Sequence, residues 1–407
     1  MYFERTIRHV VERVNATFPV LLLTGPRQVG KSTLLERMAG TERKIVSLDN
    51  PTIRLLAQSD PELFLQRYTP PVLIDEVQYA PQLFPYIKIL VDTRKQSGDF
   101  WLTGSQMFPM MKLAGESLAG RVGIIKMLGL TSSEMDGQER PAFLPEPEEM
   151  LKQLPGARPQ TVSEVFERIY RGSMPRLYEL KEVDQDFYYE SYLETYLSRD
   201  VRELGQVGNL ASFTNFLRVV AARTATTVNY AAMAQEVGVS APTIKSWLSL
   251  LVSCGLVLLV EPYANNILKR MVRSPRMYLT DTGLAVHLMG WDSARVLETG
   301  AMSGQFFETW VVTEIYKSWL NAGKTPRLSF YRDAAGKEID LLLEDNGTLY
   351  PMEIKKGSAP RDAVKNFGVL KSLEENGMRI GTGSVICMSS ELMPMDRRNW
   401  YVPCWMI

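Results

Sequence analysis

A glycine-rich stretch near the start of the chain, GPRQVGKST at residues 25–33, has residue types and spacing that bind phosphate. Glycines let backbone amides turn inward around phosphate oxygens, a lysine neutralises the β- and γ-phosphate charge, and a serine hydroxyl can ligate Mg²⁺. The pattern is G-x-x-x-x-G-K-S, and we expect Lys31 to be catalytic and Ser32 to ligate the metal. The expected nucleotide-binding residues are Gly25, Pro26, Arg27, Gln28, Val29, Gly30, Lys31, Ser32 and Thr33.

Two adjacent carboxylates follow an apolar run farther along, in PPVLIDEVQYAP at residues 70–81. A carboxylate at the tip of a buried strand can hold Mg²⁺ through water, and its neighbour can orient an attacking water. We expect Asp75 to take the first role and Glu76 the second, both in catalysis. An apolar run that ends in acids is weak evidence alone, but it becomes strong when a phosphate loop precedes it.

A third apolar run, DFWLTGSQ at residues 99–106, ends in polar residues. If this run is a strand between the other two, its tip lies beside the phosphate loop, and Ser105 or Thr103 would sense the γ-phosphate. The alternative is a plain cap of the strand end. Arg121 could reach the nucleotide of a neighbouring subunit and stabilise transition-state charge in catalysis. Its alternative is a solvated arginine at a helix end.

A second group of chemically capable residues lies near the other end of the chain, in GKEIDLLLEDNGTLYPMEIKKG at residues 336–357. Glu353 and Lys355 share one strand face because strand side chains alternate with period two. Asp340 and Glu353, with Glu308 from an upstream helix, can ligate one Mg²⁺ or Mn²⁺. Lys355 would then orient or deprotonate the water that attacks a phosphodiester. The alternative is a structural hairpin in which Lys355 forms a salt bridge with an acid.

The elements that must position these residues follow from hydrophobic patterning. Residues 20–23 form a continuous apolar run before the phosphate loop, which is typical of a strand buried on both faces of a parallel sheet. The residues after the loop have apolar positions at helical spacing. Residues 134–160 break the pattern with five prolines and a surplus of acids, and indicate a linker or mobile loop.

The segment VNYAAMAQEVGVSAPTIKSWLSLLVSCGLVLLVEPY, from residue 228, predicts a helix–turn–helix. Gly238 supplies the tight turn, Ser240 caps the second helix and Pro242 lies in its first turn. GLVLLVEPY and RMYLTDTGLA would be wing strands of a winged helix. Between them lie the basic residues Lys269, Arg270, Arg273 and Arg276. The second helix offers one lysine, Lys245, so weak contact with nucleic-acid phosphates and packing against a protein partner both stay open.

Composition limits the remaining choices. The 407 residues are 45% hydrophobic and 23% charged, which supports two to four packed domains. The formal net charge is zero, so the chain has no global basic field for nucleic acid. Three scattered cysteines argue against a disulfide framework and a zinc site. The chain shows no signal-peptide core and no apolar run of membrane-spanning length, and we expect a cytoplasmic protein without membrane contact.

Several segments together bring a family resemblance: LTGS followed by LAGRVGIIKMLGLTSSEM, YLSRDVREL at 196–204, YLTDTGLA at 278–285, and FFETWVVTEI…EIDLLLE…MEIKKG. The chain resembles, over nearly its whole length, the prokaryotic AAA-type ATP-binding proteins whose C-terminal half is a domain of unknown function. The resemblance implies ATP binding with Mg²⁺ and a helical lid over the nucleotide. It makes Arg199 a candidate for a nucleotide or interface contact, with a salt bridge inside the lid as the alternative. Relatives often act as rings, but no residue here requires one.

The order and spacing of Glu308, Asp340, Glu353 and Lys355 also resemble the four positions of the PD-(D/E)xK nuclease core, with Ile339 in place of the proline. The expected fold is therefore α/β: an AAA-type P-loop NTPase with a parallel sheet and helical lid, then a winged helix and an α/β nuclease-like domain. The expected parts are a P-loop core at 1–137, a proline-rich linker or loop at 138–160, a helical lid at 161–207, a winged helix-turn-helix at 208–298 and the nuclease-like domain at 299–407.

Two functions fit these patterns. The first is an Mg²⁺-dependent ATPase whose nucleotide state controls the winged-helix and nuclease-like half, with a second Mg²⁺ or Mn²⁺ at the C-terminal carboxylates. The second is a nucleotide-gated scaffold or regulator that does not hydrolyse ATP and whose C-terminal domain is inert.

Overall fold

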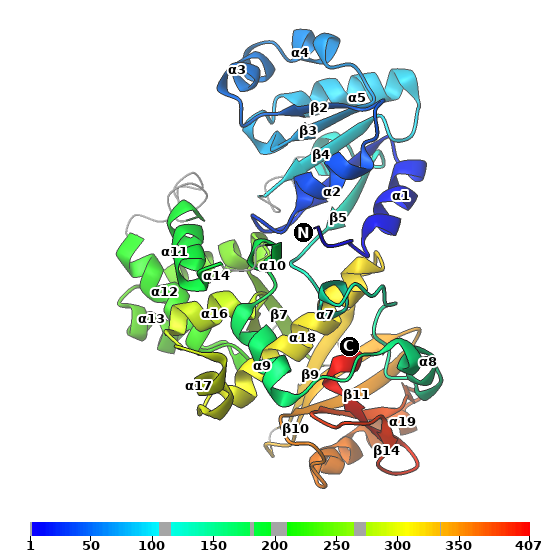
Figure 1. Ribbon diagram of the computed structural model, residues 1–407, viewed down its shortest axis with the longest axis vertical. Helices are drawn as coiled ribbons and strands as arrows, with labels where there is room; N and C mark the ends of the chain where they lie inside the picture. The colour runs from blue at the N-terminus through cyan, green and yellow to red at the C-terminus, as the bar shows by residue number, and fades with distance from the viewer. Residues whose placement is uncertain (1, 106–114, 180–182, 197–209, 264–273, 334) are drawn as a thin grey trace.

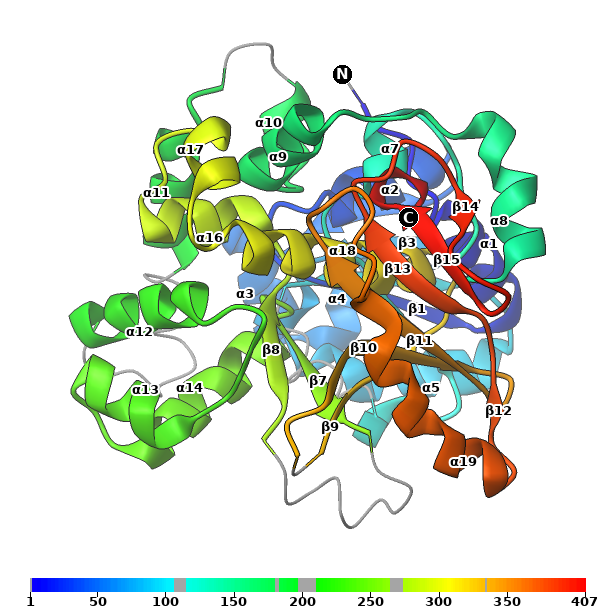
Figure 2. The same ribbon diagram turned by 90° about the horizontal axis from the view of Figure 1, so that it is seen from below.

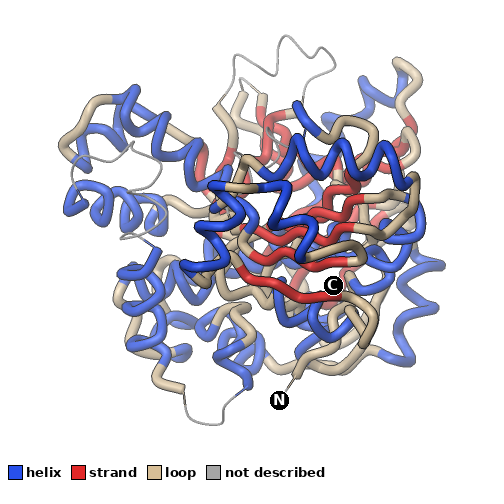
Figure 3. Tube along the Cα trace, turned by 90° about the horizontal axis from the view of Figure 1, so that it is seen from above, coloured by secondary structure: helices blue, strands red, loops and turns tan. Residues whose placement is uncertain are grey.

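A computed structural model describes residues 2–105, 115–179, 183–196, 210–263, 274–333 and 335–407. Figure 1 shows one sheet with its helices at one end of the molecule and a second sheet at the other end. The helices from the middle of the chain lie to one side. In Figure 3 the strands run through the interior and helices surround them. None of the described helices is long and apolar enough to cross a membrane.

Five parallel strands form the N-terminal sheet, in the order β2-β3-β4-β1-β5. The strands are β1 (Val20–Thr24), β2 (Lys44–Ser47), β3 (Val72–Asp75), β4 (Phe100–Gly104) and β5 (Val122–Lys126). The helices are α1 (Arg8–Thr17), α2 (Lys31–Met38), α3 (Pro51–Ser59), α4 (Pro61–Arg67) and α5 (Leu83–Arg94). The condition stated for the third apolar run is met, because β4 lies between β3 and β1. The C-terminal tips of these three strands therefore meet at one edge of the sheet.

The apolar run that predicted the first strand is buried on both faces. Every residue of β1 is buried, and its side chains alternate between two cores. Val20 and Leu22 enter one core, and Leu21 and Leu23 enter the other. Each fully buried aliphatic side chain contributes about 1.5–3 kcal/mol, so this central strand is a rigid base for the loop that follows it.

The helical region in the middle of the chain contains α7 (Ser132–Met135), α8 (Pro147–Gln153), α9 (Val162–Arg171), α10 (Arg176–Glu179), α11 (Gln185–Tyr196), α12 (Leu210–Ala222), α16 (Thr282–Met289) and α17 (Ala294–Thr299). The proline-rich stretch 138–160 includes α8 and packs against the C-terminal half. Phe143 and Met150 are buried, and Trp319 Nε1 donates to the Phe143 carbonyl at 2.9 Å. The apolar residues between the prolines explain why this stretch is packed rather than free.

Two further helices, α13 (Tyr230–Val237) and α14 (Ala241–Ser253), meet at Gly238, whose φ is 78°. The Ser240 side chain caps α14 by accepting from the Thr243 amide at 3.3 Å. Strands β6 (Thr226–Thr227), β7 (Val257–Pro262) and β8 (Arg276–Leu279) are antiparallel, in the order β7-β8-β6. Figure 2 shows α12, α13 and α14 side by side next to these strands. Lys269, Arg270 and Arg273 lie outside the described residues.

The C-terminal half has a mixed sheet that begins after the long helix α18 (Ser303–Asn321). Its strands are β9 (Arg327–Arg332), β10 (Glu338–Asp345), β11 (Thr348–Lys355), β12 (Arg379–Ile380), β13 (Gly383–Cys387), β14 (Met393–Pro394) and β15 (Asn399–Pro403), with η4 (Ala363–Leu370) and α19 (Lys371–Glu375) between β11 and β12. Strands β9, β10 and β11 are antiparallel, and β13 and β15 run parallel to β11. The DNG hairpin is present, with Asn346 and Gly347 at positive φ, which suits a type I′ turn.

One strand pairing joins the region expected to be a winged helix-turn-helix to the region expected to be nuclease-like. Strand β7 pairs in parallel with β9, with Glu261 opposite Ser329 and Pro262 opposite Phe330. The strands of the helix–turn–helix region and those of the C-terminal half therefore form one continuous ten-stranded sheet. The α/β class with a five-stranded parallel sheet, a helical region and a mixed C-terminal sheet is confirmed, while the finer division into domains stays a prediction.

Candidate functional site

The phosphate loop connects β1 to α2 at the C-terminal edge of the parallel sheet. A Cβ atom at Gly25 would lie 1.9 Å from the Met127 carbonyl oxygen, so the close approach of the chain after β5 requires glycine there. Gly30 caps α2 with a left-handed φ of 92°. The loop therefore ends at the N-terminus of a helix, where free amides and the helix dipole attract an anion.

Lys31 lies across the loop. Its Nζ donates to the carbonyl oxygens of Gly25 at 2.9 Å and Pro26 at 2.7 Å, and the residue is 6% exposed. The ammonium group is thus held within the loop by backbone oxygens. Because the oxygens of a triphosphate are negatively charged and the carbonyl oxygens are not, a triphosphate would form stronger, charge-assisted hydrogen bonds with this ammonium group.

The Asp75 carboxylate accepts hydrogen bonds from hydroxyl groups on three other elements. Its Oδ1 accepts from Ser32 Oγ at 2.5 Å and from Thr103 Oγ1, and its Oδ2 accepts from Ser47 Oγ at 3.3 Å. A serine hydroxyl beside a carboxylate offers the oxygen ligands that Mg²⁺ prefers. The predicted metal residues Ser32 and Asp75 are therefore adjacent, and they fit the ion that an AAA-type ATP site uses.

Glu76 follows Asp75 in a left-handed conformation, with φ at 56°. Its amide donates to Thr103 Oγ1 at 3.2 Å, and Gln78 Nε2 donates both to its Oε2 and to Ser105 Oγ at 3.3 Å. Burial raises the pKa of the Glu76 carboxyl, and the charge of Lys31 and the bond from Gln78 act against this rise. Thr103 thus contacts both acids directly, whereas Ser105 is linked to Glu76 only through Gln78, a residue that the sequence reasoning missed.

A cavity of about 940 Å³ extends from the loop to helices α10 and α11. On the loop side it is lined by Arg27, Gln28, Gly30, Lys31, Ser32, Thr33 and Glu76. The opposite wall includes Arg176, Glu179, Asp184, Phe187, Tyr188, Ser191, Tyr192 and Thr195. The sequence reasoning assigned none of these wall residues. The wall residues between Asp184 and Thr195 are spaced as on one face of a helix, α11. This helical spacing is the sequence signal that could have identified them.

One of the two candidate arginines, Arg121, lies away from this cavity. Arg121 precedes β5 at the amino-terminal edge of the sheet, opposite the phosphate loop, and its Nη2 donates to Asp92 Oδ2 at 3.0 Å. It does not line the cavity of its own chain, and the suggested contact with a neighbouring subunit stays a prediction. Arg199 lies outside the described residues.

Three of the C-terminal residues meet as the strand pattern indicated. Lys355 Nζ lies 2.7 Å from Asp340 Oδ2 and 2.7 Å from Glu353 Oε2, and the Ile354 amide donates to Asp340 Oδ2 at 2.9 Å. Burial and the charge of Asp340 raise the pKa of Glu353 to about 8. Burial would also raise the pKa of Asp340, but Lys355 and the Ile354 amide outweigh it and hold that pKa below its usual value.

Glu308 is held by other partners. Arg276 Nη1 lies 3.0 Å from its Oε1, and the Tyr278 hydroxyl donates to the same oxygen at 2.9 Å. Burial raises the pKa of Glu308 to about 7. Arg276 was missed as a partner because β8 and α18 are brought together only by the fold.

The structure gives no support to the predicted second metal site. Among the described residues, no three His, Cys, Asp or Glu side chains are arranged to hold a metal ion. The physical reason is that Arg276 and Lys355 already serve as the cations for Glu308, Asp340 and Glu353.

Comparison with known families places three models along the chain. Residues 17–136 match the model described as AAA domain, 162–295 match Domain of unknown function (DUF8612), and 303–407 match Domain of unknown function (DUF4143). The AAA domain covers the phosphate loop, Asp75 and Glu76. It points to ATP binding and hydrolysis with Mg²⁺ at this site.

Among solved structures, the chain is similar to the Walker-type ATPase of Pyrococcus abyssi, with 15% identity and a TM-score of 0.45. That similarity covers 70% of this chain and 96% of the other. Among curated proteins, uncharacterized protein Rv2008c of Mycobacterium tuberculosis and uncharacterized protein Mb2031c of Mycobacterium bovis are each 31% identical over 347 residues. Each alignment covers 84% of this chain and 71% of the relative. The chain therefore belongs to the family of these mycobacterial proteins.

Proposed function

We propose that the protein is an Mg²⁺-dependent ATPase that binds ATP in the cavity between the phosphate loop and α11. The observation that carries this proposal is the convergence of Lys31, the hydrogen-bonded pair Ser32 and Asp75, and Glu76 at one edge of the sheet. Lys31 would leave the loop carbonyls for the β- and γ-phosphates. Ser32 and Asp75 would hold Mg²⁺, which neutralises phosphate charge when bound.

Glu76 is the residue best placed to orient the attacking water. Its carboxylate lines the cavity, and Gln78 fixes one of its oxygens. Its left-handed backbone, which costs on the order of 1–3 kcal/mol, indicates a position kept for geometry rather than for stability. The exposed Arg176 on the opposite wall would add positive charge toward the phosphates.

Steady-state release of phosphate from ATP tests this function. The wild-type protein should release phosphate above background, and Lys31→Ala and Glu76→Gln should each lower that rate strongly. Equal background rates in all three proteins would leave the non-hydrolytic switch as the function.

The finer proposal is that the nucleotide state controls the C-terminal half through α18. The Ser132 amide of α7 donates to Glu314 Oε2 at 2.8 Å, and Glu314 also pairs with Lys317. Lys317 Nζ donates to the Leu130 carbonyl at 2.7 Å. These buried contacts bind the end of the AAA domain to α18, which carries Glu308 nearer its start.

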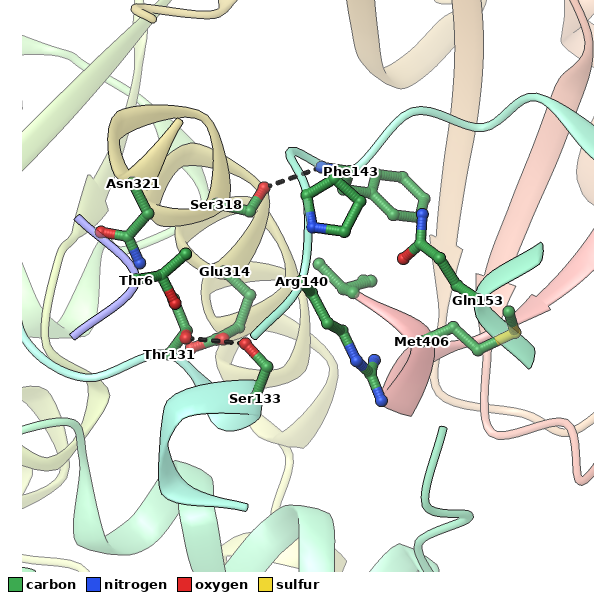
Figure 4. A pocket seen from close by; sticks show the side chains of 12 residues that line it. Thr6, Thr131, Ser133, Arg140, Phe143, Gln153, Glu314, Ser318, Asn321 and Met406 are labelled. Carbon is green, nitrogen blue, oxygen red and sulfur yellow. Dashed lines mark hydrogen bonds between the residues drawn. The ribbon is translucent and has the colours of Figure 1, made fainter. Parts of the chain in front are cut away.

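Figure 4 shows this junction around a cavity of about 10 Å³, where Thr131, Ser133, Glu314 and Asn321 converge. Such a space holds about one water molecule, so it is a packed joint and not a ligand site. A packed joint transmits movement better than a flexible linker, which supports control of the C-terminal half by nucleotide.

The winged-helix and nuclease-like assignments belong to the same proposal. The helices α13 and α14 with strands β6, β7 and β8 support the first. Asp340 on β10 beside Glu353 and Lys355 on β11 supports the second. Because Arg276 and Lys355 neutralise these carboxylates, we favour an inert, nuclease-like module over an active nuclease.

A further inference from the structure

The guanidinium of Arg5 lies buried behind the phosphate loop, and the residue is 5% exposed. Its Nη1 donates to the Val29 carbonyl at 2.9 Å, and its Nη2 donates to the carbonyls of Leu128 at 2.8 Å and Gly129 at 3.2 Å. Its Nε donates to Glu134 Oε1 at 3.2 Å. A planar guanidinium that donates to four acceptors in different directions is held in one position, so it can fix the position of the loop residue that it contacts.

The bond to Val29 acts on the next residue of the loop. A trans peptide is planar, so the Val29 carbonyl and the Gly30 N–H point to opposite sides of it. Arg5 draws the carbonyl to the back of the loop, and this turns the Gly30 N–H toward the front. Gly30 lines the nucleotide cavity beside Lys31, so its amide is then oriented to donate to a phosphate oxygen.

We propose that Arg5 is a positioning residue of the nucleotide site: it fixes the Val29–Gly30 peptide so that the loop is preorganised for phosphate. The inference rests on the proposed function of ATP binding. Arg5 does not touch the nucleotide and acts through Val29.

The carboxylate that anchors Arg5 extends this role to the C-terminal half. Glu134 Oε1 also accepts from the Thr6 amide at 2.9 Å and from Asn321 Nδ2 of α18 at 3.2 Å. Glu134 is 2% exposed, so its charge depends on these partners for neutralisation and hydrogen bonding. The loop, the N-terminal segment and α18 therefore share one buried anchor, because three hydrogen bonds in series connect the Val29 carbonyl to Asn321 of α18.

Isothermal titration calorimetry of the full chain with Mg²⁺–ATP and with Mg²⁺–tripolyphosphate tests the proposal. The Arg5→Lys variant keeps the positive charge, but an ammonium group cannot donate to both the Val29 carbonyl and the Glu134 carboxylate with the geometry of a guanidinium. We expect Kd to rise about tenfold for both ligands, since the lost contact orients a phosphate-binding amide. The matched control is Arg13→Lys, because Arg13 lies on the same N-terminal segment and donates to the Ala322 carbonyl instead. Its Kd values should equal those of the wild type.

The number of binding sites separates positioning from folding. Positioning predicts a raised Kd with one site per chain retained. A purely structural role predicts fewer sites per chain with an unchanged Kd, and that result would overturn the proposal, as would wild-type binding in Arg5→Lys. If Arg5→Lys does not fold, Glu134→Gln decides, because it keeps Arg5 and removes the charge of its acceptor: a raised Kd supports the proposal and an unchanged Kd overturns it. A wild-type protein that binds neither ligand refutes the proposed ATP site itself.

Discussion

Ser32 Oγ lies 2.5 Å from Asp75 Oδ1, although the two residues are 43 positions apart. This hydrogen bond joins the first turn of α2 to the tip of β3, so the loop that would hold the phosphates and the strand that would hold the metal are already in contact. The pair depends on the parallel sheet, which brings β1 and β3 to the same edge on either side of β4.

Replacing Asp75 by Asn should weaken the Mg²⁺ dependence of ATP binding. The amide keeps an acceptor oxygen for Ser32 but loses the charge that a metal requires. We expect the gain in ATP affinity on adding Mg²⁺ to fall about tenfold, measured by titration with and without the ion. The control is Asp92→Asn at the Arg121 pair. An unchanged Mg²⁺ effect in Asp75→Asn would rule out its metal role.

The rate of hydrolysis should depend on the ionisation of Glu76. Only the ionised carboxylate can accept a proton from water, so activity falls as pH drops through its pKa. Because burial raises that pKa, the fall should begin at a higher pH than the ordinary pKa of a glutamate carboxyl implies. A pH–rate profile tests this, and Glu76→Gln should lower the rate about 10²–10⁴-fold. If the rate of the Glu76→Gln variant shows the same fall at low pH, the fall is due to a group other than Glu76.

Removing Lys317 should destabilise the joint between the AAA domain and α18. Lys317→Met leaves the buried Glu314 carboxylate without its cation, which costs about 3–5 kcal/mol in the free energy of unfolding. Adding Glu314→Gln should recover part of this loss, because no buried charge then remains. Urea unfolding measures both variants, with the exposed Lys371→Met as control. A loss as large in the control would contradict the assignment.

The stability of the C-terminal half should fall as pH rises from about 4.5 to about 8. Glu353 has a raised folded-state pKa, so the folded chain binds more protons than the unfolded chain in this window, and stability is lost as pH rises through it. Glu353→Gln removes this proton linkage. At pH 9 it should be more stable than the wild type, by on the order of 1–3 kcal/mol. Thermal unfolding across pH checks the sign, and parallel curves for the two proteins would contradict it.

Local patterns in the sequence predicted the contacts around the phosphate loop, but not Gln78 or the opposite wall of the cavity. The glycine spacing, the buried run before the loop and the acids after β3 predicted contacts that the sheet then made, including Ser32 with Asp75. The DNG turn likewise set the register that brings Glu353 toward Asp340. Each of these signals lies within a few residues of the chain.

Contacts between distant elements left no such signal. Arg5 is one arginine in an amphipathic segment, and its four acceptors become visible only when β5, the loop and α7 pack together. Arg276 reaches Glu308 for the same reason, because β8 and α18 are neighbours only in the folded chain. In the proline-rich stretch, the prolines obscured the burial of Phe143 against α18.

Equilibrium binding of Mg²⁺–ATP to purified wild-type, Lys31→Ala and Lys88→Ala proteins tests the central claim most directly. Lys88 is an exposed lysine of α5 and controls for the loss of one positive charge. We predict saturable binding at one site in the wild type and in Lys88→Ala, and a loss of at least about a hundredfold in affinity in Lys31→Ala, because the loop then lacks its cation. Equal binding by all three proteins, or the absence of binding to the wild type, would contradict the account.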